Sequence, residues 1–314
     1  MGESIVVNVD ELWLRGKNRS LYFKALIKHV RETFWHYHGK DFSCQKEGNR
    51  ILVTTKGSFK NDIYLALKRV PGIHSFFFAK VLPVEYDNIY PAVKELVSSL
   101  KEMPNNFKVK TVRSFKRFPK NSQEVSREIG ERVLSDFPSL KAKMKNPELS
   151  IQINITEENI FVSVEKYFGM GGQPYGTTGH LITLLSGGFD SPVASYLMSK
   201  RGCSQTFIFF YSYPFVSEDV KDKILDLSSL LGRFQRETKL YVVPFGDMQK
   251  KISKSCRDEY RTLLFRKHMI ECAGILAKKL NAEALCTGDS LAQVSSQTMG
   301  NISLIDSSSK LSIF

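Results

Sequence analysis

The sequence predicts an α/β protein whose second half is built on a doubly wound parallel sheet. Three observations support this fold class. Apolar runs of strand length alternate with segments of helical periodicity along the chain. Residues 169–179 contain five glycines and a proline, a composition typical of a linker or flexible loop. After this stretch the predicted strands are continuously apolar, as in a parallel sheet that helices cover on both faces.

The segment before residue 77 has the pattern of a small α+β domain. The periodicity predicts strands at 5–9, 42–47, 51–55 and 74–81 and helices at 20–37 and 61–70, the second helix ending at Pro71-Gly72. The order strand-helix-strand-strand-helix-strand is that of a ferredoxin-like domain. We therefore predict such a domain over residues 1–76.

A second α/β unit is predicted over residues 77–168. Its expected elements are helices at 90–103 and 122–137, a basic strand at 107–118, and a hairpin-like pair of strands at 150–155 and 160–164. We place the main domain boundary in the glycine-rich stretch that follows.

The third segment, 180–314, alternates strands and helices. Strands are expected at 180–185, 205–210, 239–243, 284–287 and 311–314, and helices at 191–201, 218–231 and 258–280. No apolar run reaches the length that a membrane span needs, and the N-terminus lacks the pattern of a secretory signal. The five cysteines are irregularly spaced without a C-x-x-C pair, so neither a zinc site nor a disulfide framework is predicted, and a reducing compartment fits best.

The sequence Ser186-Gly187-Gly188-Phe189-Asp190-Ser191 joins a predicted strand to a predicted helix. Two glycines allow backbone N–H groups to approach an anion, and the helix adds further N–H groups and the positive end of its dipole. Neither a Walker motif nor a G-x-G-x-x-G fingerprint is present. The pattern S-G-G-x-D-S is specific to the loop of ATP pyrophosphatases, in which ATP is cut between its α and β phosphates. The alternative is a capped turn that binds nothing.

Along most of its length the chain resembles the tRNA 4-thiouridine synthetases, also called tRNA sulfurtransferases. The resemblance rests on these motifs: Gly16-Lys17-Asn18-Arg19, Gly171-Gly172-Gln173-Pro174, residues 184–194, and the run Gly288-Asp289-Ser290-Leu291-Ala292-Gln293-Val294-Ser295-Ser296-Gln297-Thr298. It implies a THUMP RNA-binding domain at 77–168, which could also be drawn from about residue 61, a linker at 169–179, and a PP-loop domain of the adenine nucleotide α hydrolase type at 180–314.

The resemblance also implies an ATP site with Asp190 as the catalytic residue. The implied ATP-binding residues are Leu184, Leu185, Ser186, Gly187, Gly188, Asp190, Ser191, Phe209, Phe210, Arg266, Gly288 and Gln297. Carboxyl ends of strands form the ligand crevice in open α/β sheets, and an arginine beside a triphosphate neutralises charge. Alternatively, both phenylalanines belong to the core, and Arg266 pairs with Asp258 or Glu259.

The net charge of +13 lies mostly before Met170 and makes nucleic acid a candidate partner. Phe107, Phe115 and Phe118 interleave with cations, a combination suited to phosphate contacts and base stacking. The predicted tRNA-binding residues are Lys108, Lys110, Arg113, Lys116, Arg117 and Lys120. The alternative is a solvated edge strand that lysine and arginine protect from pairing.

The implied reaction is the ATP-dependent conversion of a tRNA uridine to 4-thiouridine, with a related role in supplying sulfur for the thiazole of thiamine. Implied with it are Mg²⁺, which Asp190 can help to hold, a cysteine desulfurase as persulfide donor and a sulfur-carrier protein. We expect a cytoplasmic homodimer with no metal site of its own and no membrane partner.

In the family, a lysine and a sulfur-carrying cysteine follow the region seen here, so the chain is expected to be incomplete at its C-terminus. Cys203, Cys256, Cys272 and Cys286 match no sulfur carrier and are expected to be small core residues. Two other functions therefore stay open: a tRNA- and ATP-binding fragment that transfers no sulfur, and another PP-loop thiolation enzyme. The motif at 288–298 argues against the second.

Overall fold

The computed structural model describes residues 3–11, 16, 18–59, 62–293 and 297–314. They form two compact units. One contains residues 1–9, 34–68 and 73–169, and the other contains 10–33, 69–72 and 170–314. The chain divides after Gly169, and residues 10–33 and 69–72 belong with the C-terminal unit. Among the helices described, none is both long and apolar enough to cross a membrane.

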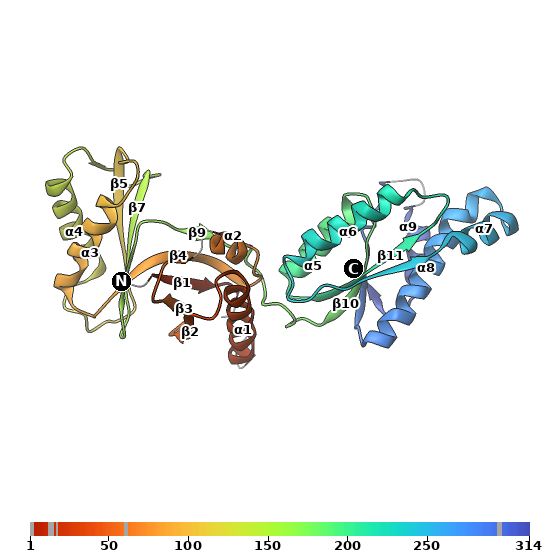
Figure 1. Cartoon of the computed structure of the whole chain (residues 1–314), viewed down its shortest axis with the longest axis horizontal. Helices are drawn as coiled ribbons and strands as arrows, with labels where there is room; N and C mark the ends of the chain where they lie inside the picture. Colours follow the sequence, from red (N-terminus) through yellow and green to blue (C-terminus); the bar gives the residue numbers. More distant parts are fainter. Residues whose placement is uncertain (1–2, 12–15, 17, 60–61, 294–296) are drawn as a thin grey trace. The chain divides into compact units, whose positions relative to one another are not determined.

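The first unit is organised by one mixed sheet (Figure 1). Its strands are β1 (Ser4–Val9), β2 (Phe42–Glu47), β3 (Arg50–Thr55), β4 (Ile73–Leu82), β5 (Asn106–Arg113), β6 (Lys141–Ala142), β7 (Leu149–Ile155), β8 (Ile160–Ser163) and β9 (Tyr167–Phe168). Their order is β2-β3-β1-β4-β8-β7-β5-β6, and β9 pairs with β4. Short β6 and β9 were not predicted, because two residues carry no periodic pattern.

Strand β4 joins the two predicted N-terminal domains. Its first part pairs antiparallel with β1, where Ser4 lies opposite Ala79, and its last residues pair with β8, where Leu82 lies opposite Ile160. The predicted boundary between residues 76 and 77 therefore falls inside a strand that both parts share. A single ten-residue strand satisfies the backbone hydrogen bonds of two neighbours, so no linker is needed there.

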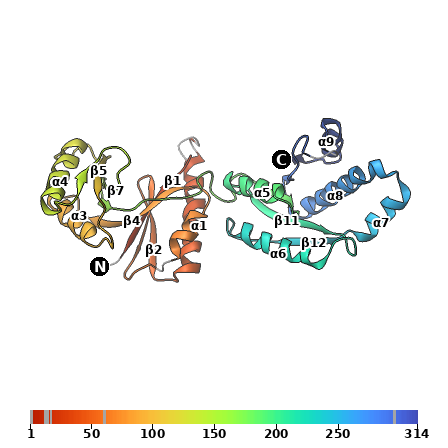
Figure 2. The ribbon, with the colours of Figure 1, turned by 90° about the horizontal axis from the view of Figure 1, so that it is seen from above.

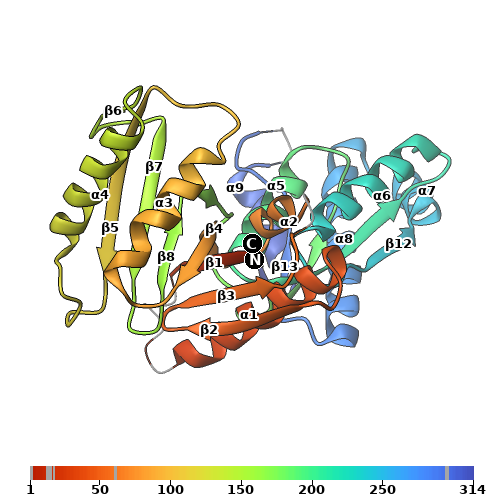
Figure 3. The same cartoon turned by 60° about the vertical axis from the view of Figure 1, so that its left-hand side comes forward.

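Two helices, α3 (Ile89–Ser98) and α4 (Ser122–Asp136), lie on one face of β5, β7 and β8 (Figure 3). Their apolar residues pack with those of the strands, for example Val93, Ile129 and Ile153. Asn121 begins α4 with a capping box, because its side chain accepts from the N–H groups of Gln123 and Glu124 while the Glu124 carboxylate accepts from its own N–H. Strand β5 ends at Arg113, five residues before the predicted end, and its neighbour β7 is parallel to it.

The second unit holds a parallel sheet in the order β12-β11-β10-β13-β14. Its strands are β10 (His180–Leu184), β11 (Ser204–Tyr211), β12 (Leu240–Pro244), β13 (Ala284–Cys286) and β14 (Ser312–Ile313). The strand order reverses between β10 and β13, and ligands bind at such a switch point in open α/β sheets. The predicted doubly wound architecture is confirmed.

Helices cover both faces of this sheet (Figures 1 and 2). They are α5 (Asp190–Lys200), α6 (Glu218–Gly232), α7 (Gly246–Ser255), α8 (Asp258–Leu280) and α9 (Met299–Asp306). Successive side chains along each strand point to opposite faces of the sheet. Phe207 packs with residues of α6, whereas Ile182 packs with residues of α8.

Two further helices, α1 (Arg19–Tyr37) and α2 (Ile63–Lys68), agree with the predicted N-terminal helices.

The glycine-rich stretch is not a flexible linker after Gly169. Gly171, Gly172, Gln173 and Pro174 are buried. The N–H of Gly172 donates to the Asp10 carboxylate at 3.0 Å, and Gln173 Nε2 donates to the Glu11 carboxylate at 2.6 Å. Gly171 and Gly172 have positive φ, and a Cβ on Gly172 would collide with the Lys200 carbonyl group. Glycine is needed here for close packing, and the prediction of flexibility is wrong for these residues.

Candidate functional site

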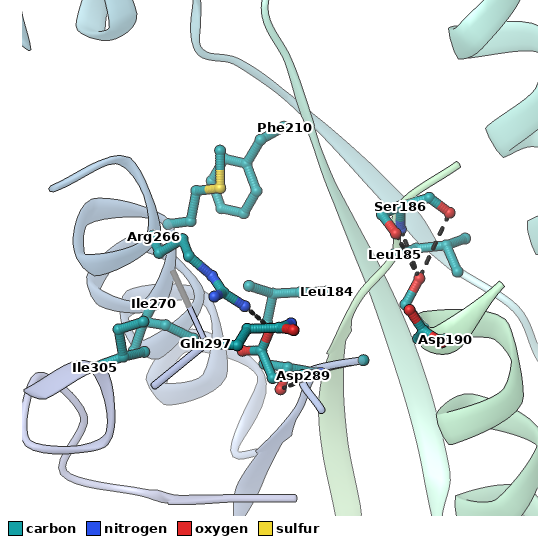
Figure 4. A pocket seen from close by; sticks show the side chains of 14 residues that line it. Leu184, Leu185, Ser186, Asp190, Phe210, Arg266, Ile270, Asp289, Gln297 and Ile305 are labelled. Carbon is teal, nitrogen blue, oxygen red and sulfur yellow. Dashed lines mark hydrogen bonds and ion pairs between the residues drawn. The ribbon is translucent and has the colours of Figure 1, made fainter. Parts of the chain in front are cut away.

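A cavity of about 320 Å³ lies where β10 and β13 end in the second unit. Figure 4 shows its lining side chains, which come from the end of β10 and the loop after it, from the end of β11, from α8, and from the segment after β13. The lining residues are Leu184, Leu185, Ser186, Asp190, Ser191, Phe210, Arg266, Met269, Ile270, Thr287, Gly288, Asp289, Gln297 and Ile305. The structure thus brings together nine of the predicted ATP-binding residues.

The loop between β10 and α5 is held by hydrogen bonds between its two serines. The Ser186 N–H donates to Ser191 Oγ at 2.9 Å, and the two hydroxyl oxygens are 3.0 Å apart. Helix α5 begins at Asp190 without a side-chain cap, so the first-turn N–H groups keep donor capacity for a ligand. This arrangement is suited to an anion.

Gly187 and Gly188 belong to this loop but do not line the cavity. A Cβ on Gly187 would have no neighbour closer than 3.9 Å, and one on Gly188 would lie 3.6 Å from Ser186 Oγ. Neither residue has a positive φ among the described backbone. The chain's own packing therefore does not require glycine at either position.

Gly288 follows β13 and lies directly against the start of α5. A Cβ there would come within 2.7 Å of the Asp190 carbonyl carbon and of Ser191 Cα, and closer still to the Ser191 N–H. These are backbone atoms, which cannot move aside as a flexible side chain can. Gly288 thus lies where the segment after β13 contacts the start of α5.

Arg266 projects from α8 into the cavity and forms an ion pair with Asp289. Asp289 Oδ1 also accepts a hydrogen bond from Gln297 Nε2 at 3.3 Å. Burial lowers the pKa of Arg266 from its usual value. The predicted alternative partners of Arg266, Asp258 and Glu259, do not pair with it; Asp258 instead pairs with Arg261 at 2.8 Å.

The two neighbouring phenylalanines at the end of β11 face opposite sides of the sheet. Phe210 lines the cavity and packs with Phe245 and Ile270 on the α8 face. Phe209 packs with Leu185 and Ile224 on the other face, among residues that contact α6. The side chain of Phe210 therefore faces the cavity, whereas the side chain of Phe209 packs in the core on the other face of the sheet.

This difference predicts unequal effects of two matched substitutions. Phe210→Ala should weaken ATP binding by about tenfold, because the apolar wall of the cavity is removed. Phe209→Ala should lower the free energy of unfolding by about 3–5 kcal/mol but leave the ATP affinity of the folded protein unchanged. Calorimetric ATP titration and urea unfolding of both variants separate the effects. If both variants lost the same amount of ATP affinity, the face of the sheet on which each phenylalanine lies would not determine whether it contacts the nucleotide.

Asp190 stands at the edge of the cavity with its carboxylate near the segment after β13. Its Oδ2 accepts from Gln293 Nε2 at 3.1 Å.

Asp289 is the second carboxylate of the cavity, and its role was not predicted although it stands inside the motif at 288–298. Met269, Ile270 and Ile305 were also missed, because apolar residues on a helix are ordinarily assigned to the core. Thr287, which follows β13, was missed as well. Lys17 and residues 294–296, which belong to the predicted motifs, lie outside the described residues.

Three of the cysteines, Cys44, Cys203 and Cys286, are buried, and Cys256 and Cys272 are partly buried. Cys203 and Cys286 are buried, and burial raises the pKa of both thiols, that of Cys286 to about 11. Burial also raises the pKa of the half-buried Cys272 thiol. Among the described residues, no group of three His, Cys, Asp or Glu side chains could hold a metal ion.

The basic stretch of the first unit divides into two sets. Arg113 donates to the Phe118 and Lys120 carbonyl oxygens at 3.0 and 3.1 Å, Lys108 donates to the Met144 carbonyl at 3.2 Å, and Lys120 pairs with Glu128. These three cations therefore have partners within the protein. The other three cations, Lys110, Lys116 and Arg117, are exposed, and the described residues supply no ion-pair partner for them.

Three family models match the chain in succession. They are the ThiI ferredoxin-like domain at residues 4–76, the THUMP domain at 84–165, and the thiamine biosynthesis protein ThiI at 176–314. A 4-thiouridine synthetase, solved in complex with RNA and bound ATP, has a TM-score of 0.88 and 27% identity, covering 100% of this chain and 80% of that one. A protein of Pyrococcus horikoshii with a TM-score of 0.73 and 22% identity covers 100% of this chain and 93% of that one, and shows the same fold.

Curated relatives agree with the family models. The probable tRNA sulfurtransferase of Thermoanaerobacter pseudethanolicus is 37% identical over 314 residues, covering 100% of this chain and 81% of that protein. The probable tRNA sulfurtransferase of Bacillus pumilus is 36% identical over 307 residues, covering 97% of this chain and 75% of that protein. With three consecutive domain matches and relatives of this similarity along its length, the chain belongs to the tRNA sulfurtransferase family.

Proposed function

We propose that this protein is an ATP-dependent tRNA sulfurtransferase, which activates a tRNA uridine for conversion to 4-thiouridine. The observation that carries the proposal is the cavity at the switch point of the parallel sheet, where the S-G-G-F-D-S loop and the start of α5 meet Arg266 and the segment after β13. The likeness to an ATP- and RNA-bound 4-thiouridine synthetase supports the same substrates.

The cavity has the size and chemistry for ATP. Its volume of about 320 Å³ is within the range of nucleotide-sized pockets. Figure 4 shows Ser186 and Asp190 on one side and Phe210, Ile270 and Ile305 on the other. We place the phosphates on the first side, at the helix N-terminus, and the adenine on the apolar second side.

The proposed reaction first activates the base and then replaces its oxygen with sulfur. O4 of the uridine attacks the α-phosphorus of ATP, a new O–P bond forms, and pyrophosphate leaves. The outer sulfur of a persulfide then attacks C4 of the base, and AMP leaves with the former O4. A free thiol then cleaves the S–S bond of this adduct, which leaves 4-thiouridine and a disulfide. Mg²⁺ would neutralise phosphate charge, and Asp190 and Asp289 are the cavity's carboxylates that fit it, since Mg²⁺ is commonly held by one or two carboxylates together with phosphates.

Three of the five thiols are poorly suited to supply the sulfur. Cys203, Cys272 and Cys286 carry raised pKa values and would be slow nucleophiles at neutral pH. We therefore propose a persulfide from a cysteine desulfurase, directly or through a sulfur-carrier protein, as the sulfur donor. We also propose that the protein acts as a homodimer in the cytoplasm and has a further role in thiamine thiazole synthesis.

We propose that Lys110, Lys116 and Arg117 contact the tRNA backbone. The double variant Lys116→Ala with Arg117→Ala should weaken tRNA binding and flatten the log–log salt slope by about 0.7–0.9 for each phosphate that the protein no longer neutralises. Lys143→Ala with Lys145→Ala, an exposed pair in the same unit, is the matched control. Filter binding across a salt series measures both slopes. An unchanged slope in the first variant would remove this stretch from the RNA interface.

The overall proposal is tested by following the modified base. The protein is incubated with tRNA, ATP, Mg²⁺ and a persulfide-loaded desulfurase, and digested nucleosides are analysed by mass. Exchange of labelled pyrophosphate into ATP, dependent on tRNA, follows the first step alone. Exchange without thiolation would mean that this protein activates the tRNA uridine but does not transfer sulfur to it. The absence of both exchange and ATP binding would contradict the proposal.

A further inference from the structure

Asp289 occupies an unusual place for an acidic residue, because it lines a cavity proposed to receive a polyanion. Its side chain is only 24% exposed, and that of its partner Arg266 is 20% exposed. A carboxylate in the same cavity as phosphates would repel them, unless a cation on the protein or a bound metal ion neutralises its charge. In the described structure the cation is Arg266.

The position of Asp289 is fixed from three directions. Its backbone follows Gly288, which lies against the backbone of Asp190 and Ser191. Its N–H donates to Thr287 Oγ1 at 3.4 Å, and its Oδ1 accepts from Gln297 Nε2 at 3.3 Å. Asp289 is therefore held by contacts with Thr287, at the start of the segment after β13, and with Gln297, near its end.

Within the described residues, Arg266 has no such bracing of its own. It projects from α8 on a long side chain, and restricting the rotamers of that side chain costs conformational entropy. The ion pair with Asp289 restricts those rotamers before a nucleotide arrives, and a guanidinium as buried as this one is costly to leave without a partner. A guanidinium has five N–H donors, so one carboxylate leaves donors for a ligand.

Resting on the proposed function, we infer that Asp289 is a positioning residue, which holds the Arg266 guanidinium in place for the nucleotide. The effect on ATP passes through Arg266. Removing the charge of Asp289 should therefore matter only while Arg266 is present.

A double-mutant cycle tests this inference. Asp289→Asn should raise the Kd for ATP by about tenfold in the wild-type background and by less than about twofold in the Arg266→Ala background. Asp306→Asn, an exposed aspartate at the end of α9, is the control and should leave the Kd unchanged. Effects that multiply, or tighter binding by Asp289→Asn, would overturn the inference. A raised Mg²⁺ requirement with independent effects would instead identify Asp289 as a metal ligand.

A second measurement needs no nucleotide and separates this inference from the proposed function. Arg266 should react with phenylglyoxal faster in Asp289→Asn than in the wild type, as followed by peptide mass, because its ion pair is removed. Unchanged reactivity would overturn the positioning role whatever the protein binds. Faster modification in a protein that binds no ATP would contradict the proposed function alone.

Discussion

Asp190→Ala should abolish tRNA-dependent exchange of pyrophosphate into ATP, with a decrease of at least about 10²–10³ in rate, while tRNA binding persists. The carboxylate lies in the first turn of α5, at the phosphate side of the cavity, and hydrogen-bonds to Gln293. Its removal takes away a group that can orient Mg²⁺ and phosphates. The exposed cations proposed to bind RNA belong to the other unit and are unchanged.

The matched control is Asp247→Ala. Asp247 also stands in the first turn of a helix, α7, but its side chain is 95% exposed and it does not line the cavity. This variant should exchange pyrophosphate at the wild-type rate. Wild-type exchange by Asp190→Ala would exclude Asp190 from the reaction, and failure of that variant to bind tRNA would show that the RNA surface extends to the phosphate loop.

The elements that the sequence predicted well are those with a strong periodic pattern. Helix α8 has its predicted bounds, and strand β2 does too. Helix α7 was missed, because its sequence is largely polar and its buried residues are few. Helix α9 was missed because it lies within and after a motif interpreted for its chemistry, although Thr298 caps it by accepting from the Asn301 N–H at 3.3 Å.

Side-chain direction explains what could be predicted of the site. The residues of the S-G-G-F-D-S loop follow directly from their place between a strand and a helix. Phe209 and Phe210 could have been separated by the alternation of a strand, since Phe210 shares its parity with Ile208, which packs on the α8 face. The partner of Arg266 could not be predicted, because Asp289 is distant in sequence and only the tertiary fold brings them together.

Glycine composition indicated flexibility where the structure shows packing. Residues 171–174 are buried because glycine permits positive φ and close contact between chain segments, as well as disorder. Composition cannot distinguish these causes. The charged stretch has the same ambiguity: Arg113 and Lys120 look like RNA contacts in the sequence, but the structure gives both of them partners within the protein.

Gly288→Ala should nearly eliminate ATP binding, although it adds a single methyl group. The new Cβ would lie within 2.7 Å of the Asp190 carbonyl carbon and of Ser191 Cα, so α5 and the segment after β13 would have to move apart. Overpacking of this kind costs about 1–3 kcal/mol or more, and the displacement would fall on the phosphate loop itself. We expect ATP affinity to fall by more than about 100-fold, as measured by calorimetric titration.

Gly300→Ala is the control for this substitution. Gly300 is in α9, and a Cβ there has no neighbour within 4 Å, so the variant should bind ATP as the wild type does. Circular dichroism and thermal unfolding would establish that Gly288→Ala remains folded at the temperature of the titration. Wild-type affinity in a folded Gly288→Ala would mean that the contact between β13 and α5 can relax without disturbing the phosphate loop. The segment after β13 would then not position the nucleotide site, and the cavity's two sides would act independently.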